Sequence, residues 1–285
     1  MSARVLVLTG FGINCEEEMA AAWRLAGAEA TVCHLNDLFV GRAALEEYDA
    51  LALPGGFSFG DDLGSGKVLA NLVRLRRLDS GRTLLDELER FLGDGKLVLG
   101  ICNGFQVLVK LGLLPNAGGR WEQEATLARN DSGRFEDRWC EHVVSPRSRS
   151  PFLAGLERIR LPVRHGEGRL VVRDERVREA IVERGLDCLA YADHDGRPTG
   201  RYPENPNGSE LACAALSDPS GQVLGMMPHP EAFLSLYNDP TWPQLRRAGA
   251  RSEEGQGLRI FHNAVRHVLA CRAGSAHQAS QGGRP

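Results

Sequence analysis

The chain has 285 residues, 42% of them hydrophobic, and its acidic and basic side chains nearly balance at a net charge of −3. This balance gives no electrostatic reason to expect nucleic acid or an anionic membrane as a partner. The seven cysteines are scattered without a Cys-x-x-Cys pair, which suits a reducing compartment. No leader peptide or 18-residue apolar span is visible, so we expect a soluble, cytoplasmic protein.

Strands and helices alternate through the first half of the chain, a pattern typical of a parallel sheet flanked by helices. In chain order, we expect a strand at 5–8, a helix at 16–26, strands at 30–34 and 51–53, a helix at 83–92 and a strand at 96–99. From about 121 to 225, short strands and turns predict an antiparallel extension. The last helix is expected at 258–271. The sequence therefore predicts one α/β domain over 1–271 with a mostly parallel central sheet, and a disordered tail at 272–285 that is rich in Gly, Ser, Gln and Arg.

The most informative motif is Gly100-Ile-Cys-Asn-Gly104, which places one cysteine between two glycines where a strand gives way to a helix. This is the pattern of a nucleophile elbow, in which a sharp turn holds the side chain at the amino end of a helix. A helix N-terminus also favours the reactive thiolate over the thiol. Cys102 is therefore the candidate nucleophile.

A second motif, Met226-Met-Pro-His-Pro-Glu231, supplies a base and its partner. In an extended segment the side chains of His229 and Glu231 project to the same face, and the flanking prolines prevent a helix. Glu231 can then fix the tautomer of His229 and stabilise its charged form. Together with Cys102, these residues form a predicted catalytic triad.

A glycine-rich loop follows the strand at 51–53 and suits the third requirement of acyl transfer, which is a pair of backbone donors for the oxyanion. Glycine permits the unusual backbone conformation and the close approach that such a loop needs. We expect the N–H groups of Gly56 and Asn103 to form the oxyanion hole.

These motifs resemble those of class I glutamine amidotransferases. Within this class, the chain is most similar to the glutaminases of phosphoribosylformylglycinamidine synthase, and the resemblance extends from about residue 4 to 268. Four segments carry it: 55–61, His165-Gly-Glu-Gly-Arg169, Asn205-Pro-Asn-Gly-Ser209 and 226–231. One departure is Ala232, where the family usually has arginine. The resemblance implies a flavodoxin-like fold and hydrolysis of glutamine through a cysteine thioester.

The resemblance also implies substrate contacts and partners. Gln106, Gly166 and Glu167 match positions that bind glutamine in the family. The ammonia would pass to an ATP-dependent synthetase subunit, possibly with a third small subunit, that converts formylglycinamide ribonucleotide to the amidine. No metal or organic cofactor is expected in this chain, because it has no phosphate-binding loop, and ATP and Mg²⁺ would belong to the synthetase.

Two other functions stay open at this point. The chain could be a glutaminase that serves a different acceptor, although the segments at 165–169 and 205–209 argue against this. It could also be a catalytically silent regulatory subunit, against which the complete set of Cys102, His229 and Glu231 argues. A near match to a dinucleotide-binding motif at 10–15 ends in Cys15, where the motif requires Gly or Ala for close helix packing.

Overall fold

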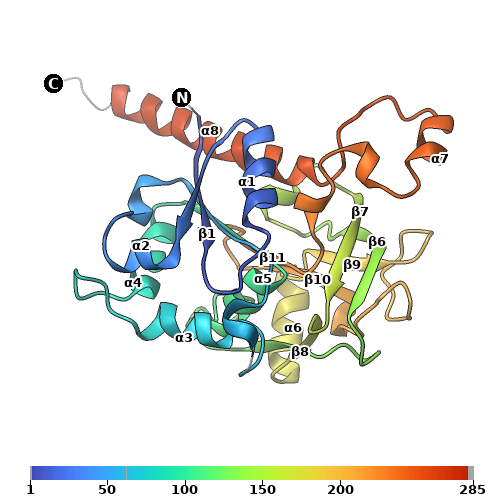
Figure 1. Ribbon diagram of the computed structural model, residues 1–285, viewed down its shortest axis with the longest axis horizontal. Coiled ribbons are helices and arrows are strands. Elements are labelled where there is room, and N and C mark those ends of the chain that lie inside the picture. The colour runs from blue at the N-terminus through green and yellow to red at the C-terminus, as the bar shows by residue number, and fades with distance from the viewer. Residues whose placement is uncertain (1, 62, 282–285) are drawn as a thin grey trace.

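The computed structural model describes residues 2–61 and 63–281. Its centre is a nine-stranded sheet with the strand order β2-β1-β3-β4-β11-β10-β9-β6-β7 (Figure 1). The first five strands in this order are parallel: β2 (Glu29–His34), β1 (Arg4–Thr9), β3 (Ala50–Leu53), β4 (Leu97–Ile101) and β11 (Val223–Met226). The remaining four continue the sheet as antiparallel neighbours: β10 (Cys213–Ser217), β9 (Leu189–Ala192), β6 (Glu136–Val144) and β7 (Arg158–His165).

A second, two-stranded antiparallel sheet pairs β5 (Ala125–Ala128) with β8 (Arg169–Val172). The predicted α/β class and the antiparallel extension are thus confirmed, with most of the extension joined edge to edge to the parallel half. The inner parallel strands are mainly apolar because helices cover both faces, and every residue of β3 and β4 is buried, whereas most residues of the edge strand β2 are exposed or half-buried.

The helices form a layer on each side of the parallel strands (Figure 1). One layer contains α1 (Glu16–Leu25) and α8 (Leu258–Gln281), which pack on each other. The other contains α2 (Leu35–Phe39), α3 (Lys67–Leu75), α4 (Leu84–Gly93) and α5 (Asn103–Lys110). The last two helices, α6 (Glu175–Arg184) and α7 (Trp242–Arg247), lie in the second half of the chain.

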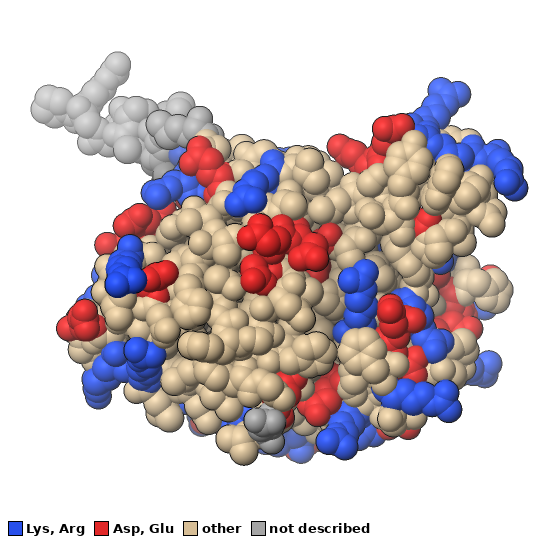
Figure 2. All heavy atoms as spheres, in the orientation of Figure 1, with Lys and Arg blue, Asp and Glu red and all other residues tan. Residues whose placement is uncertain are grey.

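Charged side chains of both signs are spread over the face shown in Figure 2, while the region over α3 is mainly uncharged. Acidic side chains gather near α1, whose first turn carries Glu16, Glu17 and Glu18. Among the residues that the structure describes, every helix is too short or too polar to cross a bilayer.

Two local predictions need correction. The last helix continues to Gln281 rather than ending at Cys271, because the segment that follows contains alanines and no proline to stop it. Much of the expected tail is therefore helical, and 282–285 lie outside the described residues. The His-Pro-Glu segment is also not extended, since Pro230–Ala232 form a 3₁₀ turn directly after His229.

Candidate active site

Cys102 lies at the junction of β4 and α5 in a strained conformation, with φ 49° and ψ −102°. Positive φ is rare for a residue with a side chain, and it is the conformation that a nucleophile elbow requires. The glycines on either side allow the sharp turn. A Cβ on Gly104 would lie 2.0 Å from the Leu53 carbonyl oxygen, and one on Gly100 would lie 2.8 Å from the Gly104 backbone. The helix can therefore pack directly on the strands, which fixes the position of Cys102.

The strand register brings the second motif to the same edge of the sheet. Parallel strands β4 and β11 pair Ile101 with Met226, and the Cys102 N–H donates to the Met226 carbonyl over 2.8 Å. The chain then continues to His229, whose N–H donates to the carbonyl of Pro162 over 2.8 Å. Two motifs more than a hundred residues apart in sequence are thus neighbours at the carboxyl ends of adjacent strands.

His229 and Glu231 form a buried pair, with side chains 4% and 2% exposed. The Nδ1 atom of His229 lies 2.6 Å from Oε1 of Glu231, so the imidazole donates from Nδ1 and leaves Nε2 facing away from the carboxylate. Burial alone would lower the pKa of His229. The Glu231 carboxylate, aided by the neighbouring thiols of Cys102 and Cys15, outweighs it and raises this pKa well above 6.5. The imidazolium form is therefore favoured.

His229 and Cys102 both lie beside the backbone of Gly55. A Cβ placed there would lie 3.0 Å from Cε1 of His229 and 3.6 Å from Cβ of Cys102, so a side chain at this position would crowd the imidazole. The Cys102 Sγ atom also lies 3.7 Å from the carbonyl oxygen of Arg164, at the end of β7. Cys102 itself is only 7% exposed.

The predicted oxyanion donors directly follow Gly55 and Cys102 in the sequence. Gly56 has φ 146°, and a Cβ there would lie 2.4 Å from the Gly12 carbonyl oxygen, so only glycine fits. Asn103 is the first residue of α5, where backbone N–H groups lack intrahelical acceptors. Among the described residues, no group accepts a hydrogen bond from the Gly56 or Asn103 N–H. Both donors are available to a ligand.

The side chain of Asn103 ties the glycine-rich loop to α5, because its Oδ1 accepts from the Ser58 N–H over 3.2 Å. Its Nδ2 donates to Gln106 Oε1 over 3.0 Å, and Gln106 Nε2 donates to the carbonyl of Glu167 over 2.6 Å. The Glu167 carboxylate in turn accepts from Ser65 Oγ over 2.6 Å. Gln106 and Glu167, predicted as substrate-binding residues, are thus directly linked.

A buried polar network holds the turn that contains Gly166 and Glu167. Asn130 donates from Nδ2 to the carbonyl of His165 over 2.8 Å and accepts at Oδ1 from the Gly168 N–H over 3.1 Å, while its own N–H donates to the Gly166 carbonyl. From the opposite side, Asn207 Nδ2 donates to the Gly168 carbonyl over 2.9 Å. Burial lowers the pKa of His165 to about 3, helped by the nearby His229, so this imidazole stays neutral.

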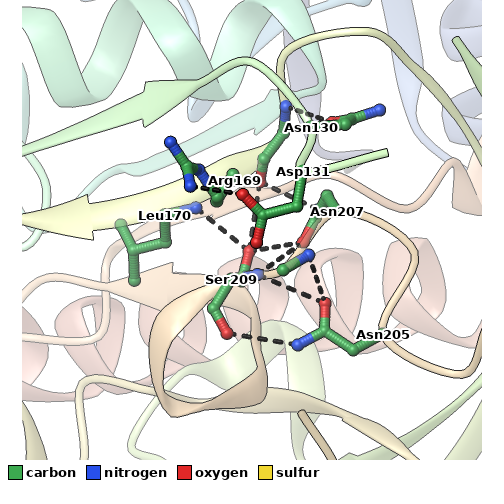
Figure 3. A network of polar contacts seen from close by, with 9 residues as sticks. Asn130, Asp131, Arg169, Leu170, Asn205, Asn207 and Ser209 are labelled. Carbon is green, nitrogen blue, oxygen red and sulfur yellow. Dashed lines mark hydrogen bonds and ion pairs between the residues drawn. The ribbon is translucent and has the colours of Figure 1, made fainter. Parts of the chain in front are cut away.

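Figure 3 shows how the network joins three segments that are distant in sequence. Asn205, Asn207 and Ser209 come from the loop between β9 and β10, and they face Asn130 and Asp131 on one side and Arg169 and Leu170 on the other. Ser209 Oγ accepts from the Leu170 N–H over 3.0 Å, and Asn205 Nδ2 donates to the Ser209 carbonyl over 3.1 Å. The Asn-Pro-Asn-Gly-Ser stretch is therefore a structural support for the turn at 165–168.

Three of the other cysteines are unsuited to act as nucleophiles. Burial raises the pKa of Cys140 to about 12, and it raises the pKa values of Cys188 and Cys213 further. These thiols are therefore neutral at physiological pH and lie inside the sheet. Cys102 combines the strained turn, the helix N-terminus and the neighbouring imidazole.

The sequence reasoning missed Cys15, which directly precedes α1 and points toward the triad. Its Sγ atom would lie 3.3 Å from a Cβ on Gly55, next to His229. In the sequence, Cys15 lies in a glycine-rich turn after the first strand, within an incomplete dinucleotide-binding motif, and nothing in that pattern predicts its contact with His229. The supporting residues Asn130 and Ser65 were missed as well, because isolated polar residues in loops carry no periodic pattern.

Comparisons with known proteins agree with this site. Residues 2–268 match the family model of the CobB/CobQ-like glutamine amidotransferase domain. The chain is 42% identical over 263 residues to phosphoribosylformylglycinamidine synthase subunit PurQ of Dehalococcoides mccartyi, covering 92% of this chain and 96% of that protein. It is 38% identical to the subunit of the same name of Methanococcus maripaludis over 273 residues, covering 93% and 97%.

Among solved structures, a chain in the structure of PurLQS from Thermotoga maritima aligns with a TM-score of 0.66 at 27% identity, covering 94% of this chain and all of that one. The region matched by the family model, residues 2–268, includes the elbow, the glycine-rich loop and the His-Pro-Glu turn. The chain therefore belongs to the family of CobB/CobQ-like glutamine amidotransferase domains.

Proposed function

We propose that this chain is the glutaminase subunit of phosphoribosylformylglycinamidine synthase in purine biosynthesis. It hydrolyses glutamine to glutamate and ammonia, and a synthetase subunit uses the ammonia to convert formylglycinamide ribonucleotide to the amidine. The observation that carries this proposal is the Cys102 elbow beside the His229–Glu231 pair, in a chain that is 42% identical to a PurQ subunit along nearly its whole length.

In the proposed mechanism, the Cys102 thiolate attacks the side-chain amide carbon of glutamine. The negative charge that develops on the amide oxygen is held by the N–H groups of Gly56 and Asn103, both of which have no acceptor in the described protein. His229 Nε2 then gives its proton to the leaving ammonia. The product of this step is a thioester on Cys102.

Hydrolysis of the thioester uses the same groups in reverse. His229, now neutral, takes a proton from a water molecule, which attacks the thioester carbon and releases glutamate and the thiolate. Glu231 keeps the proton on Nδ1 during both steps, so that Nε2 is the atom that exchanges protons. These steps use only side chains and backbone groups of this chain.

Glutamine is proposed to lie against the turn that contains Gly166 and Glu167. The buried network around Asn130 and Asn207 gives this turn a fixed shape. Gln106, which donates to the Glu167 carbonyl, connects the turn to the helix that carries Cys102. ATP and Mg²⁺ are assigned to the synthetase subunit, and the reaction to the cytoplasm.

The test is a Cys102→Ala variant reconstituted with the synthetase. We expect glutamine-dependent synthesis to disappear while synthesis from added ammonium salt continues, because the synthetase itself is unchanged. Cys33→Ala is the matched control, since Cys33 lies in β2, away from the triad, and should retain glutamine-dependent synthesis. Loss of both activities in Cys102→Ala would assign a structural role to this cysteine, and retention of both would show that Cys102 is not the nucleophile. A wild-type complex without glutamine-dependent synthesis would support a silent regulatory subunit.

A further inference from the structure

Cys15 adds a second sulfur to the candidate active site. Its Sγ, a ring nitrogen of His229 and a carboxylate oxygen of Glu231 all lie within 4.8 Å of one another. The Cys102 side chain lies on the same side, since both cysteines and the His229 ring surround the backbone of Gly55. Two thiols and an imidazole therefore share one small, largely buried space.

His229 is oriented so that one of its nitrogens faces this space. Nδ1 is bonded to Glu231, whereas the buried Nε2 has no hydrogen-bond partner in the described structure. A histidine whose second nitrogen bonds a carboxylate is the usual arrangement of a metal-binding histidine, because the carboxylate fixes the tautomer and makes the ring a better ligand. The His229–Glu231 pair thus has the arrangement of a metal-binding histidine and its supporting carboxylate.

The donor set also selects the type of metal. Two cysteine sulfurs and one histidine nitrogen are typical ligands of Zn²⁺, at about 2.3 Å for sulfur and 2.0–2.1 Å for nitrogen, whereas Mg²⁺ and Ca²⁺ prefer oxygen. Cys15 and His229 belong to the group whose donor atoms lie within 4.8 Å of one another, and the Cβ of Cys102 borders the same space, 3.6 Å from a Cβ placed on Gly55. Metal binding requires side-chain rotations that bring the three donors to these lengths. Water can fill a fourth, tetrahedral position.

We propose that Cys15, Cys102 and His229 form a binding site for Zn²⁺ or a similar soft divalent cation, and that the bound ion blocks catalysis. The ion would occupy the sulfur that attacks glutamine and the nitrogen that transfers the proton. The inhibitory effect rests on the proposed glutaminase function, whereas binding of the ion does not. This site has one more ligand than a catalytic cysteine–histidine pair alone, because Cys15 supplies a third.

Binding is measured with Co²⁺, which replaces Zn²⁺ and gives a thiolate charge-transfer absorption band. The full-length chain, freed of metal by a chelator and kept reduced, should develop this band on titration with Co²⁺ and lose it when Zn²⁺ is added. Cys15→Ser and Cys15→Ala should show a weaker band and at least about tenfold weaker binding. The two variants are used together, and their folding is checked by circular dichroism.

Inhibition is measured as glutamate release by the chain in complex with its synthetase, with each variant compared with its own metal-free rate. We expect Zn²⁺ to inhibit the wild type, a chelator to restore activity, and the Cys15 variants to need at least about ten times more Zn²⁺. Cys271→Ser is the control for binding at the surface, where Cys271 Sγ lies 3.5 Å from His267 Nε2. It should behave as the wild type.

Equal Zn²⁺ sensitivity in the wild type and both Cys15 variants would overturn the proposal, as would the absence of the Co²⁺ band from the wild type. A band that disappears in Cys271→Ser instead of the Cys15 variants would place the metal on α8 and also overturn it. If the metal-free complex releases no glutamate, the proposed function fails, while the Co²⁺ measurement still decides whether the site exists.

Discussion

Replacing Glu231 with glutamine tests whether the buried carboxylate controls the proton on His229. The substitution keeps the size of the side chain but removes the charge that raises the pKa of His229. Burial of the imidazole, which opposes its charged form, is then no longer outweighed. In addition, the new amide can donate to Nδ1, which places the remaining ring proton on Nε2. His229 is then neutral and carries its proton on the wrong nitrogen to act as a base.

The size of the effect follows from this change of tautomer. The equivalent substitution in a serine protease triad costs about 10⁴ in kcat. A thiol depends less on its base, because some thiolate exists at neutral pH without help. We therefore expect glutamate release to fall by about 10²–10³, which corresponds to about 2.7–4.1 kcal/mol of transition-state stabilisation.

The assay is glutamate release by the variant in complex with the synthetase, with ammonium-dependent synthesis measured in the same preparation. Glu253→Gln is the control for the loss of one negative charge, because the Glu253 carboxylate is exposed on the surface, where it contacts Arg246 and Tyr237. A Glu231→Gln rate within tenfold of the wild type would refute this role of the carboxylate. A loss of ammonium-dependent synthesis would show instead that the variant disturbs the complex.

Four further predictions concern reactivity, stability and control. An electrophilic glutamine analogue at limiting concentration should label Cys102 first, and mass spectrometry that finds another cysteine labelled first would contradict the assignment. Burial lowers the pKa of His142 to about 3, so the unfolded chain binds an extra proton below about pH 6.5. The contribution of His142 to the free energy of unfolding should be complete above pH 6.5 and should decrease towards pH 3, by at most about 1.4 kcal/mol per pH unit. In urea unfolding, the free energy of unfolding of His142→Phe should therefore decrease less steeply on acidification than that of the wild type. Gly104→Ala should lose about 1–3 kcal/mol because α5 must move away from β3, whereas Gly93→Ala, where a Cβ meets nothing within 4 Å, should not be destabilised. Finally, the isolated chain should be a poor glutaminase that the synthetase activates. A flip of the Gly56 peptide would remove one oxyanion donor and lower turnover by about 10²–10³. Glutamate release by the isolated chain at the full rate of the complex would exclude this control.

The parallel half of the fold could be predicted because most of its strands are apolar runs separated by helical patterns. The elbow could also be recognised from a local pattern, because the sharp turn at Cys102 requires glycine at positions 100 and 104. In the structure, a Cβ at either position would overlap neighbouring atoms. The register of β4 and β11, which brings His229 to Cys102, could only be inferred from the chemistry that a thiol nucleophile needs. No local pattern in the sequence specifies which strands become neighbours.

The remaining parts depend on contacts between distant loops. Cys15 reaches the site because the turn after β1 packs on the glycine-rich loop, where the Asn14 N–H donates to the Gly55 carbonyl over 3.2 Å. The role of Asn207 depends on carbonyl groups of a turn that is distant in sequence. The 3₁₀ turn at Pro230–Ala232 replaces the expected extended segment, and in this turn Nδ1 of His229 lies 2.6 Å from Oε1 of Glu231.

The position of β11 in the sequence separates the two parts of the candidate site. The candidate nucleophile and both candidate oxyanion donors lie within the first 103 residues, whereas the candidate base and its carboxylate follow β11, which pairs with β4 in the folded chain. The whole antiparallel part of the sheet emerges from the ribosome in between. A nascent or truncated chain that ends before β11 contains the candidate thiol without the candidate base, and we expect it not to consume glutamine. We therefore expect activity only in chains in which β11, at the end of the long connection from β4, has joined the parallel sheet.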